Sequence, residues 1–331
     1  MSERYEIYRR LGSGSFGEVL EARDKKRGGA PVALKRIFLK NLDAGYFPAA
    51  PFRELQALRA LEHPNIVRYL GSFCESRALT IVTDVHPTDL GELIARFKGP
   101  LPEAAAASIT RDILAGLAHM HACGIMHRDV KPANMFVGLD GHVHVGDMGL
   151  ARPFRLLASE TAPGPLLFTS QVSSRWYRAP EILWGGVQYG PEIDVWGVGA
   201  IFAEFFLGKP LAPGFSDINQ LSLIVKLLGS VDETVWPGLR ETLDWGKLQF
   251  STCERCDFRK LLQDGLPSEA AIDLLENLLL WDPNKRLTAA QALEHPALSE
   301  KNCARGRALV SEFAKIATGE QKDVWRCEAT F

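Results

Sequence analysis

Two short segments near the beginning of the chain contain residues that suit the binding of phosphate groups. Gly12, Gly14 and Gly17 form the pattern G-x-G-x-x-G-x-V, which ends at Val19. Glycine lets a backbone approach phosphate oxygens closely and adopt turns that other residues disfavour. The pattern alone also fits an ordinary hairpin or a dinucleotide-binding turn. The dinucleotide alternative requires a helix directly after the glycines, whereas residues 18–22 (EVLEA) favour a strand.

The second segment is Val32-Ala33-Leu34-Lys35, which places a lysine within an apolar strand. A charge among apolar residues is costly unless it is paired, and Glu54 on the next predicted helix is a natural partner. The ammonium group would then be able to hold nucleotide phosphates. A lysine that simply extends into solvent is the alternative, and it would be preferred if this segment stood alone.

The segment 127–134 (HRDVKPAN) decides between these alternatives. It resembles the catalytic loop H-R-D-x-K-P-x-N of protein kinases, and Asp147-Met148-Gly149 and Ala179-Pro180-Glu181 follow at the expected intervals. Four ordered motifs with compatible spacing make a chance match implausible. The resemblance implies a serine/threonine protein kinase that uses ATP and Mg²⁺.

The same resemblance implies a role for each polar residue of the catalytic loop. Asp129 would orient the substrate hydroxyl and accept its proton, and Lys131 would steady the transferring phosphoryl group. Asn134 and Asp147 would hold Mg²⁺, which prefers oxygen ligands. The lysines and metal ions would offset the negative charge of in-line transfer. The residues expected to be catalytic are Asp129, Lys131, Lys35 and Glu54.

ATP is expected to bind where a small lobe meets a larger one. Thr83 would be the gatekeeper, and the backbone of Asp84 and His86 would bind adenine. Because threonine is small, a back pocket is expected that admits bulky inhibitors. The full set of expected ATP contacts is Leu11, Gly12, Gly14, Gly17, Val19, Ala33, Lys35, Thr83, Asp84 and His86.

Two further stretches narrow the resemblance to the cyclin-dependent kinases. These are residues 52–55 (FREL) before 63–67 (HPNIV), and 176–183 (WYRAPEIL). Within that group the chain is most similar to the cell-cycle-related kinase branch, which includes kinases linked to cilium and flagellum length. The stretches that carry this second step are 88–92, 210–214, 217–221, 235–237 and 247–250. The cytoplasm, the nucleus and the cilium are the compartments that this resemblance implies.

Thr169 aligns with the activating phosphothreonine of the family. Arg53, Arg128 and Arg152 are each positioned by their motifs to converge on one dianion, so a phosphate at Thr169 would pair with all three. An upstream kinase or autophosphorylation would supply that phosphate. An unmodified threonine in a solvated loop is the alternative.

Substrate selection is expected to depend on Ser174 and Arg178. Ser174 matches a hydroxyl beside the catalytic Asp and Lys, and Arg178 helps to shape the site after the phosphoacceptor. The resemblance therefore implies protein substrates with Ser/Thr-Pro sequences. Ser173 departs from the usual small apolar residue, which leaves the stringency of this preference open.

Three departures from the family pattern affect packing and regulation. Met148 replaces the usual phenylalanine but remains apolar. Phe16 replaces a tyrosine that many cyclin-dependent kinases use for inhibitory phosphorylation, so that control is absent. Residues 46–51 lack the full cyclin-contacting signature, so a cyclin or another activator on the small lobe are both open.

The elements that must position these residues fall into two groups. Strands are predicted over 5–11, 17–22, 32–38, 66–73 and 79–84, with one helix over 51–61 that begins with proline. Helices follow over 90–97, 103–123, 194–207, 218–228, 268–280 and 288–293, from apolar residues at helical spacing. The predicted fold is α+β and bilobal, as in eukaryotic protein kinases. The predicted units are a small lobe over 1–85, a large lobe over 86–298 and a tail over 299–331.

Three polar residues outside the catalytic loop are assigned to the scaffold. Glu181 and Arg286 are expected to form a buried ion pair in the large lobe. Asp194 is expected to anchor the catalytic loop from a helix. The tail contains apolar and charged residues at roughly helical spacing, so it either docks on the kinase core or binds a partner.

Composition excludes several other classes of protein. The 331 residues are 46% hydrophobic and 24% charged, with a formal net charge of −2. These values fit a globular enzyme and give no indication of nucleic-acid or membrane partners. Of the six cysteines, only Cys253 and Cys256 are spaced as C-x-x-C, and a zinc site needs about four ligands, so reduced thiols are expected.

Two other functions remain as alternatives. A catalytically inactive scaffold would normally have lost Lys35, Asp129 or Asp147, and all three are present. A small-molecule phosphotransferase is the second alternative. The APE motif and the long segment between Gly149 and Ala179 argue against it, because protein kinases use that region to bind peptides.

Overall fold

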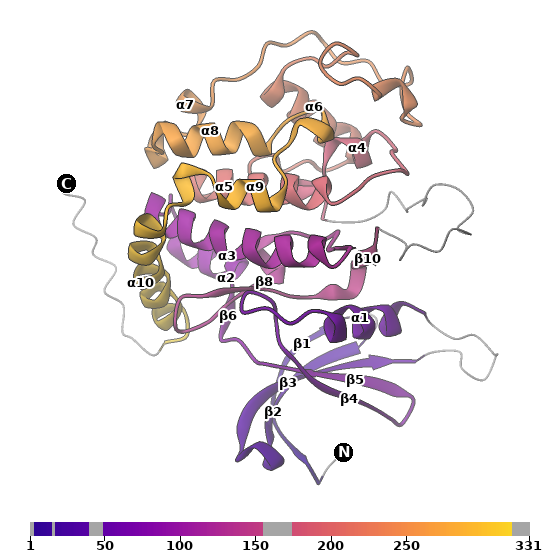
Figure 1. The fold of residues 1–331 in the computed structure, drawn as a ribbon, viewed down its shortest axis with the longest axis vertical. Helices are drawn as coiled ribbons and strands as arrows, with labels where there is room; N and C mark the ends of the chain where they lie inside the picture. Colours follow the sequence, from indigo (N-terminus) through magenta and orange to yellow (C-terminus); the bar gives the residue numbers. More distant parts are fainter. Residues whose placement is uncertain (1–2, 15–16, 40–48, 155–173, 320–331) are drawn as a thin grey trace.

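The computed structural model describes residues 3–14, 17–39, 49–154 and 174–319. A strand-rich lobe and a larger helical lobe follow one another along the long axis of the molecule (Figure 1). The α+β, bilobal fold predicted from the sequence is confirmed.

The small lobe is a five-stranded antiparallel sheet with the order β1-β2-β3-β5-β4. One of its faces buries a small apolar cluster that includes Leu20, Val32, Leu34 and Val82. Burial of this face accounts for the alternation of apolar residues along the strands. The strands are β1 (Tyr5–Gly14), β2 (Gly17–Asp24), β3 (Ala30–Phe38), β4 (Tyr69–Glu75) and β5 (Ala78–Thr83).

The strand register places the predicted nucleotide-binding residues near one another. Gly14 pairs with Gly17 at the end of the β1–β2 hairpin, as the glycine-rich pattern suggested. Gly17 has to be glycine, because a Cβ there would overlap the carbonyl oxygen of Arg36 on β3. Val19 pairs with Lys35 across β2 and β3.

The segment before β4 differs from the prediction. A strand was expected from Ile66, but β4 begins at Tyr69. Val67 donates its N–H to the carbonyl of Val145, and Val145 donates its own to the carbonyl of Asn65, at 2.9 and 2.8 Å. The backbone around Ile66 is therefore bonded to the large lobe, and only the residues after it join the small-lobe sheet.

Helices build the large lobe. Helix α5 is mostly apolar and almost wholly buried, with Phe202, Phe205 and Phe206 in its C-terminal half. A helix of this kind belongs inside a helical body rather than on its surface. No helix in the described ranges is long and apolar enough to cross a bilayer. The longer helices are α2 (Leu90–Phe97), α3 (Glu103–Ala122), α5 (Glu192–Leu207), α6 (Asp217–Leu228), α8 (Glu269–Leu278) and α10 (Glu300–Ala317).

Short elements lie where the two lobes meet. Helix α1 (Ala49–Ala60) packs beside the 3-10 turn at Met148–Leu150. Strand β8 lies between β6 and β9. The remaining short elements are β6 (Thr88–Asp89), β7 (Ile125–Met126), β8 (Met135–Val137), β9 (Val143–Val145), β10 (Arg152–Pro153), α4 (Pro180–Leu183), α7 (Phe258–Leu261) and α9 (Ala289–Leu293).

The described part of the tail docks on the kinase core. Helix α10 lies against α3 and α2 (Figure 1). At Gly306 the two helices approach so closely that a Cβ would overlap the Ala104 carbonyl oxygen. Arg307 donates to Asp112 of α3 at 3.1 Å, and the Phe313 ring lies 5.0 Å from that of Phe97. Of the two alternatives for the tail, docking is therefore confirmed through residue 319.

Candidate active site

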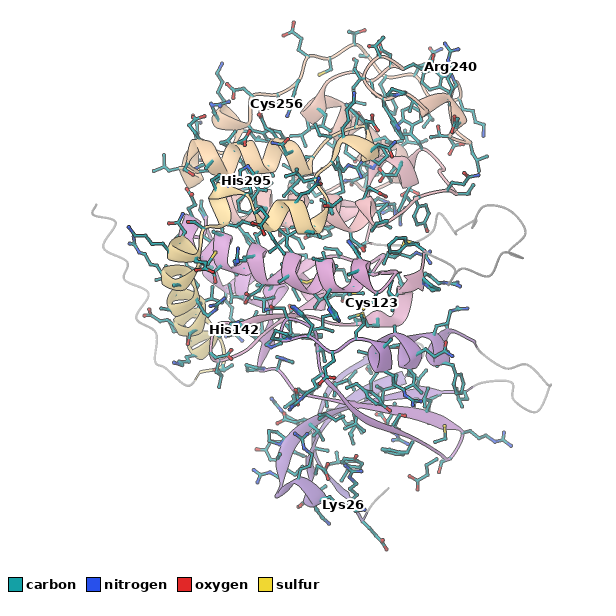
Figure 2. All side chains as sticks on the ribbon, viewed as in Figure 1. Lys26, Cys123, His142, Arg240, Cys256 and His295 are labelled. Atoms are coloured by element: carbon teal, nitrogen blue, oxygen red, sulfur yellow. The ribbon has the colours of Figure 1, made fainter. Side chains whose placement is uncertain are left out.

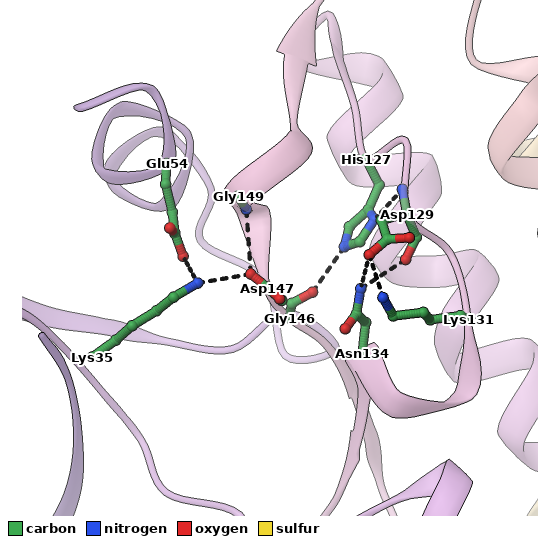
Figure 3. A network of polar contacts seen from close by, with 9 residues as sticks. All are labelled: Lys35, Glu54, His127, Asp129, Lys131, Asn134, Gly146, Asp147 and Gly149. Carbon is green, nitrogen blue, oxygen red and sulfur yellow. Dashed lines mark hydrogen bonds and ion pairs between the residues drawn. The ribbon is translucent and has the colours of Figure 1, made fainter. Parts of the chain in front are cut away.

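Lys35 on β3 contacts one carboxylate of the small lobe and one of the large lobe (Figure 3). Its Nζ lies 2.6 Å from Oε1 of Glu54 on α1 and 2.7 Å from Oδ1 of Asp147. The expected pairing of Lys35 with Glu54 is confirmed. Glu54 is buried, whereas the side chain of Asp147 is 44% exposed, so only one of the carboxylates faces solvent.

The charges in this trio affect one another. Burial acts to lower the pKa of Lys35, but Glu54 and Asp147 outweigh it and raise that pKa above its usual value. Burial also raises the pKa of Glu54, with Lys35 opposing the effect. At Asp147 the neighbouring ammonium overcomes burial and lowers the pKa. Lys35 and Asp147 are therefore both charged at neutral pH.

Asp129 is the centre of a second network (Figure 3). Its Oδ2 accepts hydrogen bonds from Lys131 Nζ at 2.6 Å and from Asn134 Nδ2 at 2.9 Å. Its Oδ1 accepts one from the backbone N–H of Ser174 at 3.0 Å. The structure thus brings together four of the predicted residues, from two segments about 40 positions apart.

A buried aspartate on helix α5 holds the backbone of the catalytic loop in place. Asp194, fully buried on α5, accepts from the N–H groups of His127 and Arg128, both at 2.8 Å. The predicted anchoring role of Asp194 is confirmed. His127 Nε2 donates to the carbonyl of Gly146 at 2.8 Å, which holds the loop against the segment that ends at Asp147.

Asn134 and Asp147 offer oxygen atoms suited to Mg²⁺. Asn134 donates its amide N–H groups to Asp129, which leaves the amide oxygen for another partner. The Asp147 carboxylate is ionised and partly exposed. The donor set therefore fits a hard divalent cation. The two residues are adjacent, since Gly146 donates its N–H to the Asn134 carbonyl at 3.0 Å.

The cysteines form no metal site in the described parts of the chain. No group of three or more metal-ligating side chains occurs there. Cys253 and Cys256 are free thiols. Cys256 lies at the far end of the large lobe and Cys123 lies near the small lobe (Figure 2). The five described cysteines form no disulfide with one another.

The link between the lobes runs from Thr83 to His86. Thr83 ends β5 and pairs with Ala33 of β3. Asp84 receives two hydrogen bonds from Arg68, at 2.9 and 3.1 Å, which hold the start of the link. Burial, followed by the nearby His144, lowers the pKa of His86 to about 4, so its ring is neutral.

Two residues at this link were not predicted from the sequence. The ring of Phe136 on β8 stacks on the ring of His86, with 5.8 Å between centroids. Gly146 lies against the same phenyl ring. Phe136 lies two residues after Asn134, in the middle of the short strand β8, and its place between the apolar residues Met135 and Val137 was the available signal. Nothing in the sequence indicated that Gly146 lies beside it.

The arginines expected to hold a phosphate are described, but Thr169 is not. Arg128 is buried, and its ring contact is Tyr189, 5.7 Å from the guanidinium carbon. Burial lowers the pKa of Arg128, and the charge of Arg152 lowers it further, so these two cations are neighbours. Arg53 lies on α1. Thr169, together with Phe16 and Ser173, lies outside the described residues.

The segment after Ser174 is held by α6. Asp217, at the start of that helix, accepts from Arg175 Nε at 2.8 Å and from Arg178 Nη1 at 3.1 Å. Tyr177 donates its hydroxyl to the buried Glu204 at 2.7 Å. The predicted substrate residues Ser174 and Arg178 are thus fixed at both ends of one short segment. The contacts of Asp217 with Arg175 and Arg178 were not predicted.

Comparison with known proteins agrees with this geometry. Residues 5–298 match the sequence model described as the protein kinase domain. Human cyclin-dependent kinase 20 is 37% identical over 294 residues, which cover 88% of this chain and 82% of that protein. The zebrafish protein of that name is 36% identical over 295 residues, 89% of this chain and 83% of its own. Cell division control protein 2 homolog 1 of Trypanosoma brucei brucei is 36% identical over 313 residues, 90% of this chain and 99% of its own.

Proposed function

Because the chain belongs to the protein kinase family, among the serine/threonine kinases similar to cyclin-dependent kinases, we propose that it transfers the γ-phosphoryl group of ATP to serine and threonine hydroxyls of proteins through Asp129. The observation that carries this proposal is the network at Asp129. One carboxylate is held by a lysine, an amide and a backbone N–H, within 2.6–3.0 Å.

We assign the acceptor side of the reaction to Asp129 and Lys131. Asp129 Oδ1 is oriented by the N–H of Ser174, so a hydroxyl bound along residues 174–178 would meet a fixed acceptor for its proton. Lys131 lies on the other oxygen and would place its charge beside the transferring group. Removal of either contact would misplace the acceptor rather than unfold the loop, since Asp194 holds the backbone separately.

The donor side is assigned to Lys35, with Glu54 as its positioning partner. The buried Glu54 fixes the ammonium, which is then directed at the phosphates of ATP. Asn134 and Asp147 would hold Mg²⁺, which supplies charge neutralisation of the phosphate oxygens when bound. The ATP base would lie among Leu11, Val19, Ala33 and the link at Thr83, Asp84 and His86.

The preference for a proline after the acceptor is proposed from Arg178. Its side chain is held toward Asp217, and the segment it belongs to begins at Ser174, whose N–H donates to Asp129. Peptides that differ only in proline or alanine after the serine would test this preference. We expect at least tenfold faster phosphorylation of the proline peptide, and equal rates would remove the proposal.

Activation is assigned to phosphorylation of Thr169. Arg128 and Arg152 are neighbouring cations, one of them buried, and a dianion beside them would offset their repulsion. An upstream kinase or the chain itself would add the phosphate. A variant with Thr169→Ala should therefore lose most activity while retaining nucleotide binding.

The similar proteins support only broad proposals about the partners of this chain and its location in the cell. We propose protein substrates, a cyclin or another activator on the small lobe, and a role in cell-cycle or cilium-length control, in the cytoplasm, the nucleus or the cilium. Nucleic acid and membrane are not proposed as partners. We retain the division into residues 1–85, 86–298 and 299–331 as a proposal, since the sheet ends at Thr83 and α10 follows Ser299.

Phosphate transfer to a generic basic protein tests the central proposal. The variant Asp147→Asn retains the shape of the side chain but removes its charge, so transfer should fall at least a hundredfold. The matched control is Asp264→Asn, a change at an exposed aspartate far from the site. Undetectable transfer by the wild-type chain phosphorylated at Thr169 would favour the inactive-scaffold alternative instead.

A further inference from the structure

A cavity of about 710 Å³ opens in the large lobe beside the end of helix α4. Its walls come from three stretches of the chain, within residues 181–192, 236–242 and 283–284. Helix α4 lies in the half of the large lobe that is far from the small lobe (Figure 1). Ligand pockets in proteins typically have volumes of about 300–1,000 Å³, so this cavity is large enough to hold a ligand. None of the described residues that line it is assigned above to catalysis, ATP or Mg²⁺.

Two glycines shape one wall of the cavity. A Cβ at Gly186 would lie 2.5 Å from the carbonyl oxygen of Glu181, so the turn after α4 passes close to the backbone of that helix. A Cβ at Gly190 would lie 2.5 Å from Oε2 of Glu192 and 3.3 Å from its Oε1. The Glu192 carboxylate therefore lies against the backbone of Gly190. The lack of a side chain at residue 190 leaves the space that this carboxylate occupies.

The carboxylate of Glu192 has no cationic side chain within ion-pair distance among the described residues. Glu181, the other glutamate of the same wall, is paired with Arg286 at 2.6 Å. Arg286 donates only to the backbone carbonyl of Glu192, at 3.2 Å. Burial raises the pKa of the Glu192 carboxyl, and the nearby Glu181 acts in the same direction. A cation that entered the cavity would therefore stabilise the ionised form of Glu192.

The basic residues next to the cavity are engaged elsewhere. Glu241 is an exposed carboxylate at its rim and forms no ion pair within the described ranges. Arg240, labelled in Figure 2, pairs instead with Glu233 at 2.6 Å. Lys285 lies 3.8 Å from Asp282. The described cations around the cavity thus leave its negative charge uncompensated.

The rest of the lining is largely apolar. Val187, Pro237 and Pro283 contribute aliphatic surface, and the ring of Trp236 is almost fully buried beside them. An arginine side chain combines an aliphatic stem, which packs on apolar surface, with a charged end. The planar guanidinium group forms paired hydrogen bonds with carboxylates and is more weakly hydrated than an ammonium group. Arginine therefore fits both the walls and the charge of this cavity.

We propose that the cavity binds an arginine side chain of a partner protein, with Glu192 as its charge partner and Glu241 at the entrance. The site belongs to the large lobe and follows the substrate segment in the chain, since Glu181 lies three residues after Arg178. A partner held there would be docked beside the region that is proposed to bind substrates. The proposal concerns a separate site and does not depend on phosphoryl transfer.

The test compares two capped heptapeptides, Gly-Ala-Leu-X-Leu-Ala-Gly, in which X is arginine or its neutral isostere citrulline. Binding to the full ¹⁵N-labelled chain is followed by NMR through the amide signals of Gly186 and Gly190. We expect saturable shifts with the arginine peptide and roughly tenfold weaker binding of the citrulline peptide, because charge-assisted hydrogen bonds are lost. Glu192→Gln should bring the two affinities to within about threefold of each other. Gly190→Ala retains the charge but displaces the carboxylate, so it should also reduce the preference for arginine.

Glu254→Gln is the matched control, because Glu254 is an exposed glutamate outside the cavity, and this variant should retain the preference. Equal affinity of the two peptides for the wild type overturns the inference, whether or not the variants fold. A preference for arginine that persists in Glu192→Gln also overturns it, as does the absence of shifts at Gly186 and Gly190 at millimolar peptide. Shifts at these glycines that depend on protein concentration alone would assign the cavity to a second copy of the chain and would overturn it as well.

Discussion

Individual charges at the active site have more than one partner. Lys35 is shared between Glu54 and Asp147, and the Asp129 carboxylate is shared among three donors. A group held from several directions loses little further entropy when a substrate arrives, which is what preorganisation requires. Single substitutions can therefore test the role of each residue of the site.

The gatekeeper substitution Thr83→Phe tests the proposed back pocket. Thr83 ends β5 opposite Ala33, so a phenyl ring there would fill the space behind the link. We expect inhibitors that bind the link and extend past Thr83 to lose at least tenfold in potency, with KM for ATP changed less than threefold. Inhibition constants for one bulky and one compact inhibitor, measured on both proteins, provide the comparison. Equal potency of the bulky inhibitor on both proteins would contradict the prediction.

His86 should make the stability of the protein dependent on pH. Its pKa falls from 6.5 to about 4 on folding, first because it is buried and second because His144 is close. The unfolded chain therefore binds the proton more readily, and stability is lost as pH falls from about 6.5 toward 4. Between pH 7.5 and 5 this residue alone should remove about 2 kcal/mol from the free energy of unfolding.

The variant His86→Phe retains a ring that can stack but does not titrate. Denaturant unfolding of both proteins at pH 7.5 and pH 5 should show a smaller loss in the variant. His63 and His144, whose pKa values are also lowered by burial, remain and contribute in the same direction in both proteins. An identical loss in the two proteins would exclude His86 as the source.

At the scale of elements, short segments position the chemistry and long helices hold the segments. The catalytic loop, β8 and the 3-10 turn after Asp147 are each only a few residues long. None of them has enough apolar surface to be stable alone. Helix α5 supports them with Asp194, and α6 supports the substrate segment with Asp217.

Helix α10 provides a test at this scale. Gly306→Val would introduce a side chain at the point where α10 touches the backbone of α3. Overpacking of this kind costs about 1–3 kcal/mol, so we expect a lower melting temperature and faster amide exchange along α10. Ala304→Val on the exposed face of the same helix is the matched control. Equal stability of the two variants would show that α10 does not depend on the close approach.

At the scale of the whole molecule, distant segments are joined by polar contacts as well as by the core. The predicted ion pair of Glu181 and Arg286 is confirmed, with two hydrogen bonds of 2.6 and 2.7 Å between residues 105 positions apart. Arg286 has 0% side-chain exposure and also donates to the carbonyls of Leu280 and Glu192. The pair therefore ties α4 to the region between α8 and α9.

Loss of this pair should destabilise the large lobe. Glu181→Gln leaves Arg286 buried without its counter-charge, which costs about 3–5 kcal/mol in such sites. Denaturant unfolding should show the loss, and thermal unfolding should show it as a lower midpoint. The matched control, Glu269→Gln, removes an exposed ion pair with Arg259 and should leave stability almost unchanged. A loss at Glu181 no larger than at Glu269 would contradict the argument.

The sequence by itself determined the class of fold, the family resemblance and the residues expected to carry the chemistry. Helices over 90–97 and 103–122 lie within one residue of their predicted bounds, because helical spacing of apolar residues is a local property. Lys35 and Glu54 were predicted as a pair because a charge in an apolar strand needs a partner. Asp129, Asn134 and Asp147 were recognised because their motifs are contiguous in the chain.

Only the tertiary structure decided which residues meet across long separations. Ile66 does not join the predicted strand because its neighbours bond to Val145, 79 positions further along the chain. Asp217 and Phe136 gained their places at the active site through packing of α6 and β8, which no local pattern encodes. Gly146 shows the reason most clearly: its lack of a side chain matters only because the ring of Phe136 lies against it in the folded chain.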